Sequence, residues 1–240
     1  VTQFQAQAYR ELLPAGGPVK TAIIGQETPE IVAQAERVKN FMNYQITYEM
    51  EEYDPELDQM LFYLPIVGSS FKKVYFDPSL QRAVSKFVHA EDLIVPYNAT
   101  DLKTSTRICH VIRMDSNEIR KLQLTGFYKD IELPTSEADT DNYDEVKETI
   151  KDIEGMSSSN YNEELTLYEI HTDLDLPGFE DVNPLGEATG LKMPYIVTIV
   201  ESSGEVLSIK RNFNEADPLR SKIPYFVHYK FLPGLGFYGF

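Results

Sequence analysis

The sequence is poor in the residues that build most catalytic and metal sites. It contains one cysteine, four histidines and no tryptophan in 240 residues. A single cysteine excludes an internal disulfide and is typical of a reducing compartment. Cys109 lies in the strand-like segment RICHVIRM, and we interpret it as a buried, unreactive thiol. Four scattered histidines offer little material for a histidine-based active site.

Long apolar runs are also absent. No stretch approaches the roughly 18 consecutive apolar residues that a membrane-spanning helix needs. We therefore expect no membrane-spanning segment and no membrane partner. The chain starts VTQF, without an initiator methionine, and finishes with the apolar, glycine-rich FLPGLGFYGF. These ends lead us to expect a fragment of a longer polypeptide.

Positive charge is scarce, with 22 Lys and Arg against 38 Asp and Glu and a net charge of −16. The excess is concentrated between Asp130 and Pro184, where 17 acidic residues and two lysines give a net charge of −15. The rest of the chain therefore carries only −1. Such a surface repels a phosphate backbone, which argues against a sequence-specific nucleic-acid-binding protein.

The acidic residues form no complete metal or catalytic motif. Asp139, Asp141 and Asp144 resemble the start of a calcium loop, but Asp144 occupies the position that the loop reserves for glycine. His171 and Asp173 lack a partner His or Cys that would complete a metal site. No nucleophile elbow or defensible Ser-His-Asp order is present. We expect no cofactor, no metal and no catalytic residue, and keep a carboxylate-dependent hydrolase as the third alternative.

Helix signals gather in the N-terminal part. Residues 3–13 are predicted to form a short helix. Thr28-Pro29 starts a helix with one apolar stripe, expected to continue to about residue 50. Asp54 is predicted to cap a further helix that Pro65 ends.

Beyond residue 65 the pattern changes to strands and short helices. Strands are predicted at 71–76, 87–97, 107–114, 165–176 and 223–232, and a hairpin joins 194–200 to 205–213. A capping-box helix is predicted from Asp115 to Gly126. In the acidic region we predict a loop at 135–142 and an amphipathic helix at 142–155.

These elements predict an α+β fold with a mostly antiparallel β-sheet, a long N-terminal amphipathic helix and short packing helices. We divide the chain into a helical part (1–64), an α+β unit (65–133), an acidic segment (134–193) and a hairpin-and-strand part (194–240).

Three strings carry a family resemblance. They are the helix–turn–strand stretch Tyr53–Pro78, the short string Asn43-Tyr44-Gln45, and the C-terminal string His228–Phe240. In this order they resemble the portal protein of short-tailed double-stranded-DNA phages, and the match is weakest at about 134–193. The specificity lies in several long strings in one order, because no single motif is chemically diagnostic.

The resemblance implies a ring-forming structural protein. Portal subunits form rings, usually dodecameric, at one capsid vertex of the virion after assembly in the host cytoplasm. DNA is packaged through the ring by the terminase and later leaves by it, while tail adaptors, scaffold and coat proteins contact it. The fragment would then be mainly the N-terminal, wing part of the subunit.

Candidates for contacts in such a ring are the long helix predicted at 29–50 and two charged surfaces. Lys72 and Lys73 are the most basic local feature, and we predict a subunit or partner contact there, against a solvated strand face as the plainer interpretation. The acidic region is predicted to face the channel or a neighbouring subunit, with these candidate residues: Asp139, Asp141, Asp144, Glu145 and Glu148. The alternative function is an acidic interaction domain, an adaptor that binds a basic partner without forming a ring.

Overall fold

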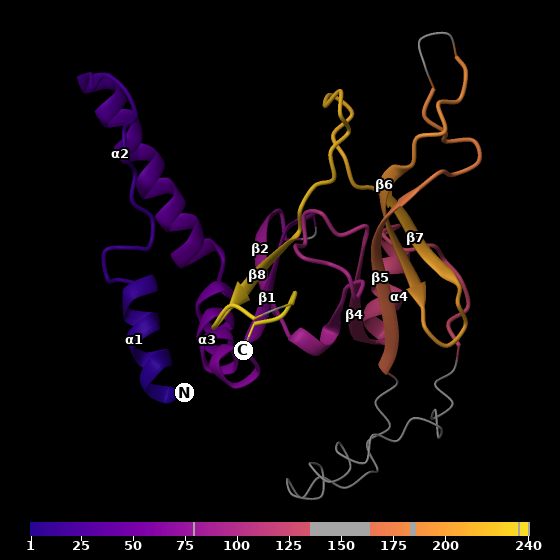
Figure 1. The fold of residues 1–240 in the computed structure, drawn as a ribbon, viewed down its shortest axis with the longest axis horizontal. Helices are drawn as coiled ribbons and strands as arrows, with labels where there is room; N and C mark the ends of the chain where they lie inside the picture. Colours follow the sequence, from indigo (N-terminus) through magenta and orange to yellow (C-terminus); the bar gives the residue numbers. More distant parts are fainter. Residues whose placement is uncertain (79, 135–163, 183–185, 235, 240) are drawn as a thin grey trace, which may run out of the picture. The chain divides into compact units, whose positions relative to one another are not determined.

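A computed structural model describes residues 1–78, 80–134, 164–182, 186–234 and 236–239, which divide into two units (Figure 1). Unit 1 consists of Val1–Glu91, Tyr97–Ser105 and Pro224–Phe240, and unit 2 of Asp92–Pro96 and Thr106–Ile223. Both units combine helical segments with an antiparallel sheet. The predicted α+β fold is therefore confirmed.

The sheet of unit 1 has three antiparallel strands in the order β2-β1-β8. These are β1 (Ser69–Asp77), β2 (Arg82–Val88) and β8 (Phe226–Lys230). The predictions near β1 and β8 are confirmed, but the strand predicted at 87–97 is wrong. Its position instead holds the end of β2, a 3-10 turn η2 (Ala90–Asp92) and a two-residue strand β3 (Leu93–Ile94). The β1–β2 hairpin has no glycine signal, because Gln81 itself adopts the left-handed conformation, at φ 54°.

Three α-helices belong to unit 1: α1 (Thr2–Leu12), α2 (Pro29–Tyr44) and α3 (Tyr53–Val67). Their packing centres on Leu57, Met60 and Leu61 of α3, which α1 covers with Phe4, Ala8 and Tyr9. The side chain of Gln5 also donates to Asp58 at 2.7 Å. The helix predicted at 3–13 is therefore confirmed, and it serves to bury one face of α3.

Helix α3 differs from the prediction at both ends. It starts at Tyr53, and the carboxylate of Asp54 accepts the hydroxyl of Tyr9 instead of capping the helix. Pro65 lies inside the helix and does not end it. The helix tolerates this proline because, in the last turn, it removes only one hydrogen-bond donor. The helix ends at Gly68, which has φ 83° and donates its N–H to the carbonyl of Leu64.

Helix α2 is shorter than the helix predicted for this region. Thr28 caps it as expected, accepting the N–H of Ile31 at 3.3 Å. Its 16 α-helical residues are followed by a five-residue π-helix, η1 (Gln45–Glu49), so a single long α-helix is not confirmed. Asn43 anchors this end, because its side chain bonds both the N–H and the carbonyl of Val19.

The C-terminal turn of unit 1 packs on the start of β1. The ring of His228 stacks against two others, with its centroid 4.5 Å from that of Phe71 and 4.7 Å from that of Phe237, and these two centroids are 6.1 Å apart. Ser69 Oγ contacts His228 Nε2 at 3.2 Å and accepts the N–H of Gly239 at 2.8 Å. A Cβ on Gly239 would come within 2.6 Å of two backbone carbonyl oxygens, so only glycine fits there.

The outer edge of β2 is covered by carboxylates from α3 and the residue before it. Glu56 Oε2 accepts the N–H of Phe87 at 2.6 Å, and Glu52 Oε1 accepts the N–H of Ser85 at 3.3 Å. Glu52 also pairs with Arg82 at 2.7 Å. Burial raises the pKa of Glu52, but backbone hydrogen bonds and Arg82 outweigh burial and hold that pKa below its usual range. These acids satisfy edge donors that would otherwise invite pairing with another chain.

We expect Glu56→Ala to lower the free energy of unfolding by about 1–2 kcal/mol, because it leaves a partly buried N–H unpaired. Urea denaturation followed by tyrosine fluorescence measures this change. Glu91→Ala, at an exposed position of the same unit, is the matched control. Equal stability of the two variants would contradict the role of Glu56.

The described residues of unit 2 form a five-stranded antiparallel sheet in the order β3-β4-β5-β6-β7. Its long strands are β4 (Arg107–Asp115), β5 (Glu164–Leu174), β6 (Met193–Val200) and β7 (Val206–Arg211). Helix α4 (Ser116–Leu124) packs on it, with Ile119 among Leu165, Leu167 and Val200. The predicted strands 107–114 and 165–176 and the predicted hairpin are confirmed.

Two other predictions for unit 2 have different outcomes. The capping box at Asp115 is wrong, because no side-chain hydrogen bond caps α4. The loop predicted at 135–142 and the helix predicted at 142–155 lie outside the described residues. Within the part of the chain that the structure describes, no helix is long and apolar enough to cross a bilayer.

Candidate functional site

Lys72 lies inside unit 1 and not on its surface. Its residue is 2% exposed, and its Nζ lies 4.1 Å from the ring centroid of Tyr53 without a hydrogen-bond partner. Burial lowers the pKa of Lys72 to about 8, against the opposing effect of Glu56 and Glu52. In the folded unit this ammonium group faces α3 and is not presented to a partner.

Lys73 lies on the opposite face of β1, because successive side chains of a strand alternate. It is half-buried, and its Nζ lies 5.4 Å from the ring centroid of Tyr75 and 5.8 Å from that of Phe226. The two lysines therefore do not form one basic patch. Of the pair, Lys73 has the side chain that a partner could reach, and its role in a subunit contact stays a prediction.

The predicted acidic candidates Asp139, Asp141, Asp144, Glu145 and Glu148 all lie outside the described residues. Several described acids of the same region already have partners. Asp130 pairs with Arg120, and Glu169 contacts His171 at 2.9 Å. The acidic region is thus in part engaged within unit 2.

Helix α2 carries the predicted apolar stripe, in which Ala35 is half-buried whereas Ile31, Val38 and Met42 are exposed. None of the 16 residues of α2 is buried, and the three stripe residues are 41–43% exposed. Phe41, next to the stripe, is 58% exposed. The sequence predicted this stripe, but not that it would be left exposed.

Unit 2 contains a polar cavity of about 360 Å³ at the start of β6 and the end of β7. Rings of Phe179, Tyr195 and Phe213 line it together with Arg211 and Arg220. Tyr195 and Phe213 meet edge to face at 6.4 Å. Sequence analysis missed this site, because its residues come from separate segments.

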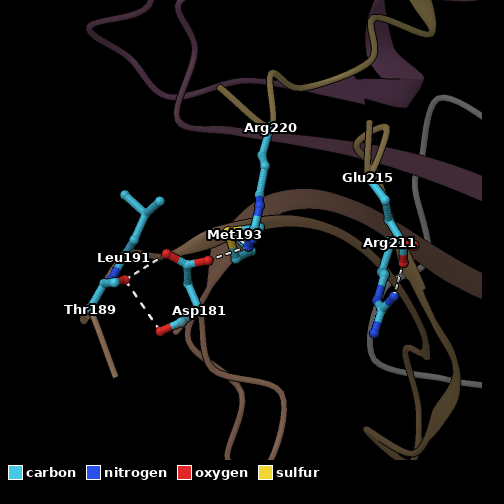
Figure 2. Close-up of polar contacts among 7 residues, drawn as sticks. All are labelled: Asp181, Thr189, Leu191, Met193, Arg211, Glu215 and Arg220. Atoms are coloured by element: carbon cyan, nitrogen blue, oxygen red, sulfur yellow. Dashed lines mark hydrogen bonds and ion pairs between the residues drawn. The ribbon is translucent and has the colours of Figure 1, made fainter. Parts of the chain in front are cut away.

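Both arginines of the cavity are paired with carboxylates, as Figure 2 shows. Arg220 bonds Asp181, which also accepts the hydroxyl of Thr189 at 2.7 Å. Arg220 has φ 47°, and its turn is held by Asp217, which accepts the N–H groups of Leu219 and Ser221. Those backbone hydrogen bonds lower the pKa of Asp217. Arg211 bonds Glu215, four residues further on.

Among the described residues, no group of three or more His, Cys, Asp or Glu side chains could hold a metal ion. The pKa of the Cys109 thiol is raised, chiefly by burial. This thiol is therefore poorly activated as a nucleophile. Neither a family model nor a curated protein matches the chain.

Proposed function

We propose that the chain is a structural subunit of a phage portal ring, the conduit through which double-stranded DNA is packaged and ejected. In this role it belongs to the virion, at one capsid vertex. Its partners are further copies of itself, in a dodecameric ring, together with terminase, tail-adaptor, scaffold and coat proteins. It has no catalytic role.

The sequence resemblance supports this proposal through residues of one unit. The three strings fall at the end of α2, in α3 and β1, and in β8 with the turn that follows. β1 and β8 are adjacent strands, paired from Ser69 with Lys230 to Lys73 with Phe226. All three strings thus lie in unit 1, and the two longer ones meet through the pairing of β1 with β8.

The exposed stripe of α2 is the observation that carries the proposal. A helix of about 16 residues is marginal in water without tertiary packing. Ile31, Val38 and Met42 are each more than two-fifths exposed, so the stripe needs a cover. In a ring, one face of each subunit contacts a different face of the next, which provides that cover in every copy.

The charge of the chain suits a DNA conduit. Lys and Arg contacts to phosphates release counterions and bind DNA tightly, which would hinder sliding. A net charge of −16 instead repels the duplex. The acidic segment facing the channel or a neighbouring subunit remains part of the proposal.

Electron microscopy of the full-length polypeptide that carries this sequence tests the proposal. We expect rings with a central hole wide enough for a DNA duplex. Val38→Asp should abolish the rings or reduce them severalfold, because it places a charge in the contact. Leu219→Asp is the matched control, since Leu219 is an exposed apolar residue of unit 2. Monomeric particles without any rings, at every protein concentration, would contradict the proposed ring.

The alternative is an acidic adaptor domain, favoured by the net charge of −15 between Asp130 and Pro184. An adaptor would bind a basic protein tightly, and the affinity would fall steeply as salt rises. It would also remain monomeric at high concentration. A portal subunit would instead bind a basic protein only weakly, and it would form rings at high concentration.

A further inference from the structure

The cavity of unit 2 combines aromatic rings with two guanidinium groups, although the function proposed above makes no use of it. Its volume of about 360 Å³ is within the range of small-ligand sites. Phe179 lies at its border and is 64% exposed, which leaves a ring face free for contact. Tyr195, by contrast, is buried and forms part of its wall.

The two ion pairs of the cavity differ in how easily they can be opened. The Asp181 side chain is only 12% exposed, and Arg220 also contacts the Met193 sulfur at 3.7 Å. The side chains of Arg211 and Glu215, by contrast, are 50% and 72% exposed. An exposed pair contributes little to stability, because water and side-chain entropy compete with it. Glu215 can therefore be displaced from Arg211, whereas Asp181 stays on Arg220.

We infer that this cavity binds a peptide segment carrying an aromatic residue beside an aspartate or glutamate, whose carboxylate replaces that of Glu215 on Arg211. The aromatic side chain of the ligand packs on Phe179 and Phe213. A carboxylate accepts a strong, charge-assisted hydrogen bond from a guanidinium group, and Glu215 already does so through one contact between its Oε1 and Arg211 Nη1. Glu215 thus acts as an internal stand-in for the ligand.

The charges of the cavity favour a carboxylate over a phosphate. Glu180 stays close to the site, because its carboxylate accepts the N–H of Gly178 at 2.9 Å. With Glu215 displaced, Glu180 and Asp181 balance the two arginines. A single negative charge can be accommodated there, but the near-double charge of a phosphate adds repulsion that Arg211 alone does not offset.

The peptide pair Ac-Phe-Glu-NH2 and Ac-Phe-Gln-NH2 tests this inference, because the two differ only in the carboxylate. Binding is followed by NMR titration of the Arg211 Nε–H signal in the full chain. We expect the glutamate peptide to bind in the millimolar range and the glutamine peptide to bind at least five-fold more weakly. Glu215→Gln should tighten binding of the glutamate peptide about three-fold or more, because it weakens the internal competitor. Arg211→Gln should abolish binding, which is followed in this variant by the backbone amide signal of Phe213, another residue of the cavity lining.

Glu205→Gln is the matched control, an exposed acid of unit 2 outside the cavity, and it should leave the affinity unchanged. The inference fails if the glutamate peptide gives no saturable shift, if both peptides bind equally, or if Glu215→Gln has no effect. Displacement of the peptide by an equal concentration of inorganic phosphate would also overturn it, in favour of a general anion site.

Discussion

Replacing Lys72 with methionine is expected to raise the free energy of unfolding of unit 1 by about 1–3 kcal/mol at pH 7, because a buried charge is removed and the volume is kept. The folded pKa of Lys72 is about 8, against 10.5 for a free lysine. Folding at neutral pH must therefore bury a protonated amine that interacts only with a ring and two nearby carboxylates. Methionine fills the same space without this cost.

The same substitution should remove a pH dependence. A lysine with a lowered folded pKa binds its proton more tightly in the unfolded state. Lys72 therefore destabilises the folded wild-type chain most below pH 8. The free energy of unfolding rises as pH increases from about 8 toward 10.5. Urea denaturation between pH 7 and 9.5 should show this rise in the wild type and a flat profile in Lys72→Met.

Lys73→Met provides the control, because it removes a lysine from the opposite face of β1, where the side chain is half-buried. We expect it to change the stability by less than about 0.5 kcal/mol at pH 7. A Lys72→Met variant that is less stable than the wild type would show that the ammonium group is a net stabilising contact.

Acidification is expected to weaken unit 1 through His228. Burial lowers the pKa of His228 to about 4, with Lys230 acting in the same direction and Asp101 opposing it. The neutral ring is the folded form, so the contribution of His228 is complete above the unfolded pKa of about 6.5 and is lost as pH falls toward 4. The loss should reach about 2 kcal/mol by pH 4.5.

Two measurements check this loss. NMR titration of the His228 ring protons should give a midpoint well below 6 in the folded chain. His228→Phe preserves the stacking of residue 228 on Phe71 and on Phe237 but cannot be protonated, so its stability should change less between pH 6.5 and 4.5. A midpoint near 6.5, or an equal decline in the variant, would contradict the argument.

Local pattern predicted most of the strands because their side chains alternate over a buried sheet. The hairpin of β6 and β7 follows from two apolar strands around Ser203 and Gly204. The hairpin of β1 and β2 was missed, since its left-handed residue is Gln81 and no glycine marks the turn. The start of α3 was misplaced because Asp54 bonds a tyrosine from another helix, a contact that no local pattern contains.

The candidate sites depend on long-range contacts, and the sequence offers less information about them. Two adjacent lysines in a strand must point to opposite faces, so the burial of one of them could have been expected from β1 alone. The sequence of β1 could not, however, indicate which of its two faces α3 would cover. Asp181 and Arg220 are 39 positions apart and come together only through the sheet and its loops. Phe179, Arg211 and Phe213 likewise gain meaning only as the lining of one cavity.

The discontinuous composition of unit 1 has a consequence for synthesis on the ribosome. Its central strand β1 cannot complete its pairing until β8 has been translated, about 150 residues later. The strands of unit 2 that the structure describes are made within that interval, since the last of these ends at Arg211. We therefore expect unit 2 to fold first as the nascent chain emerges, while β1 waits with one edge unpaired. During that wait, the early half of the chain is the part that most needs a chaperone.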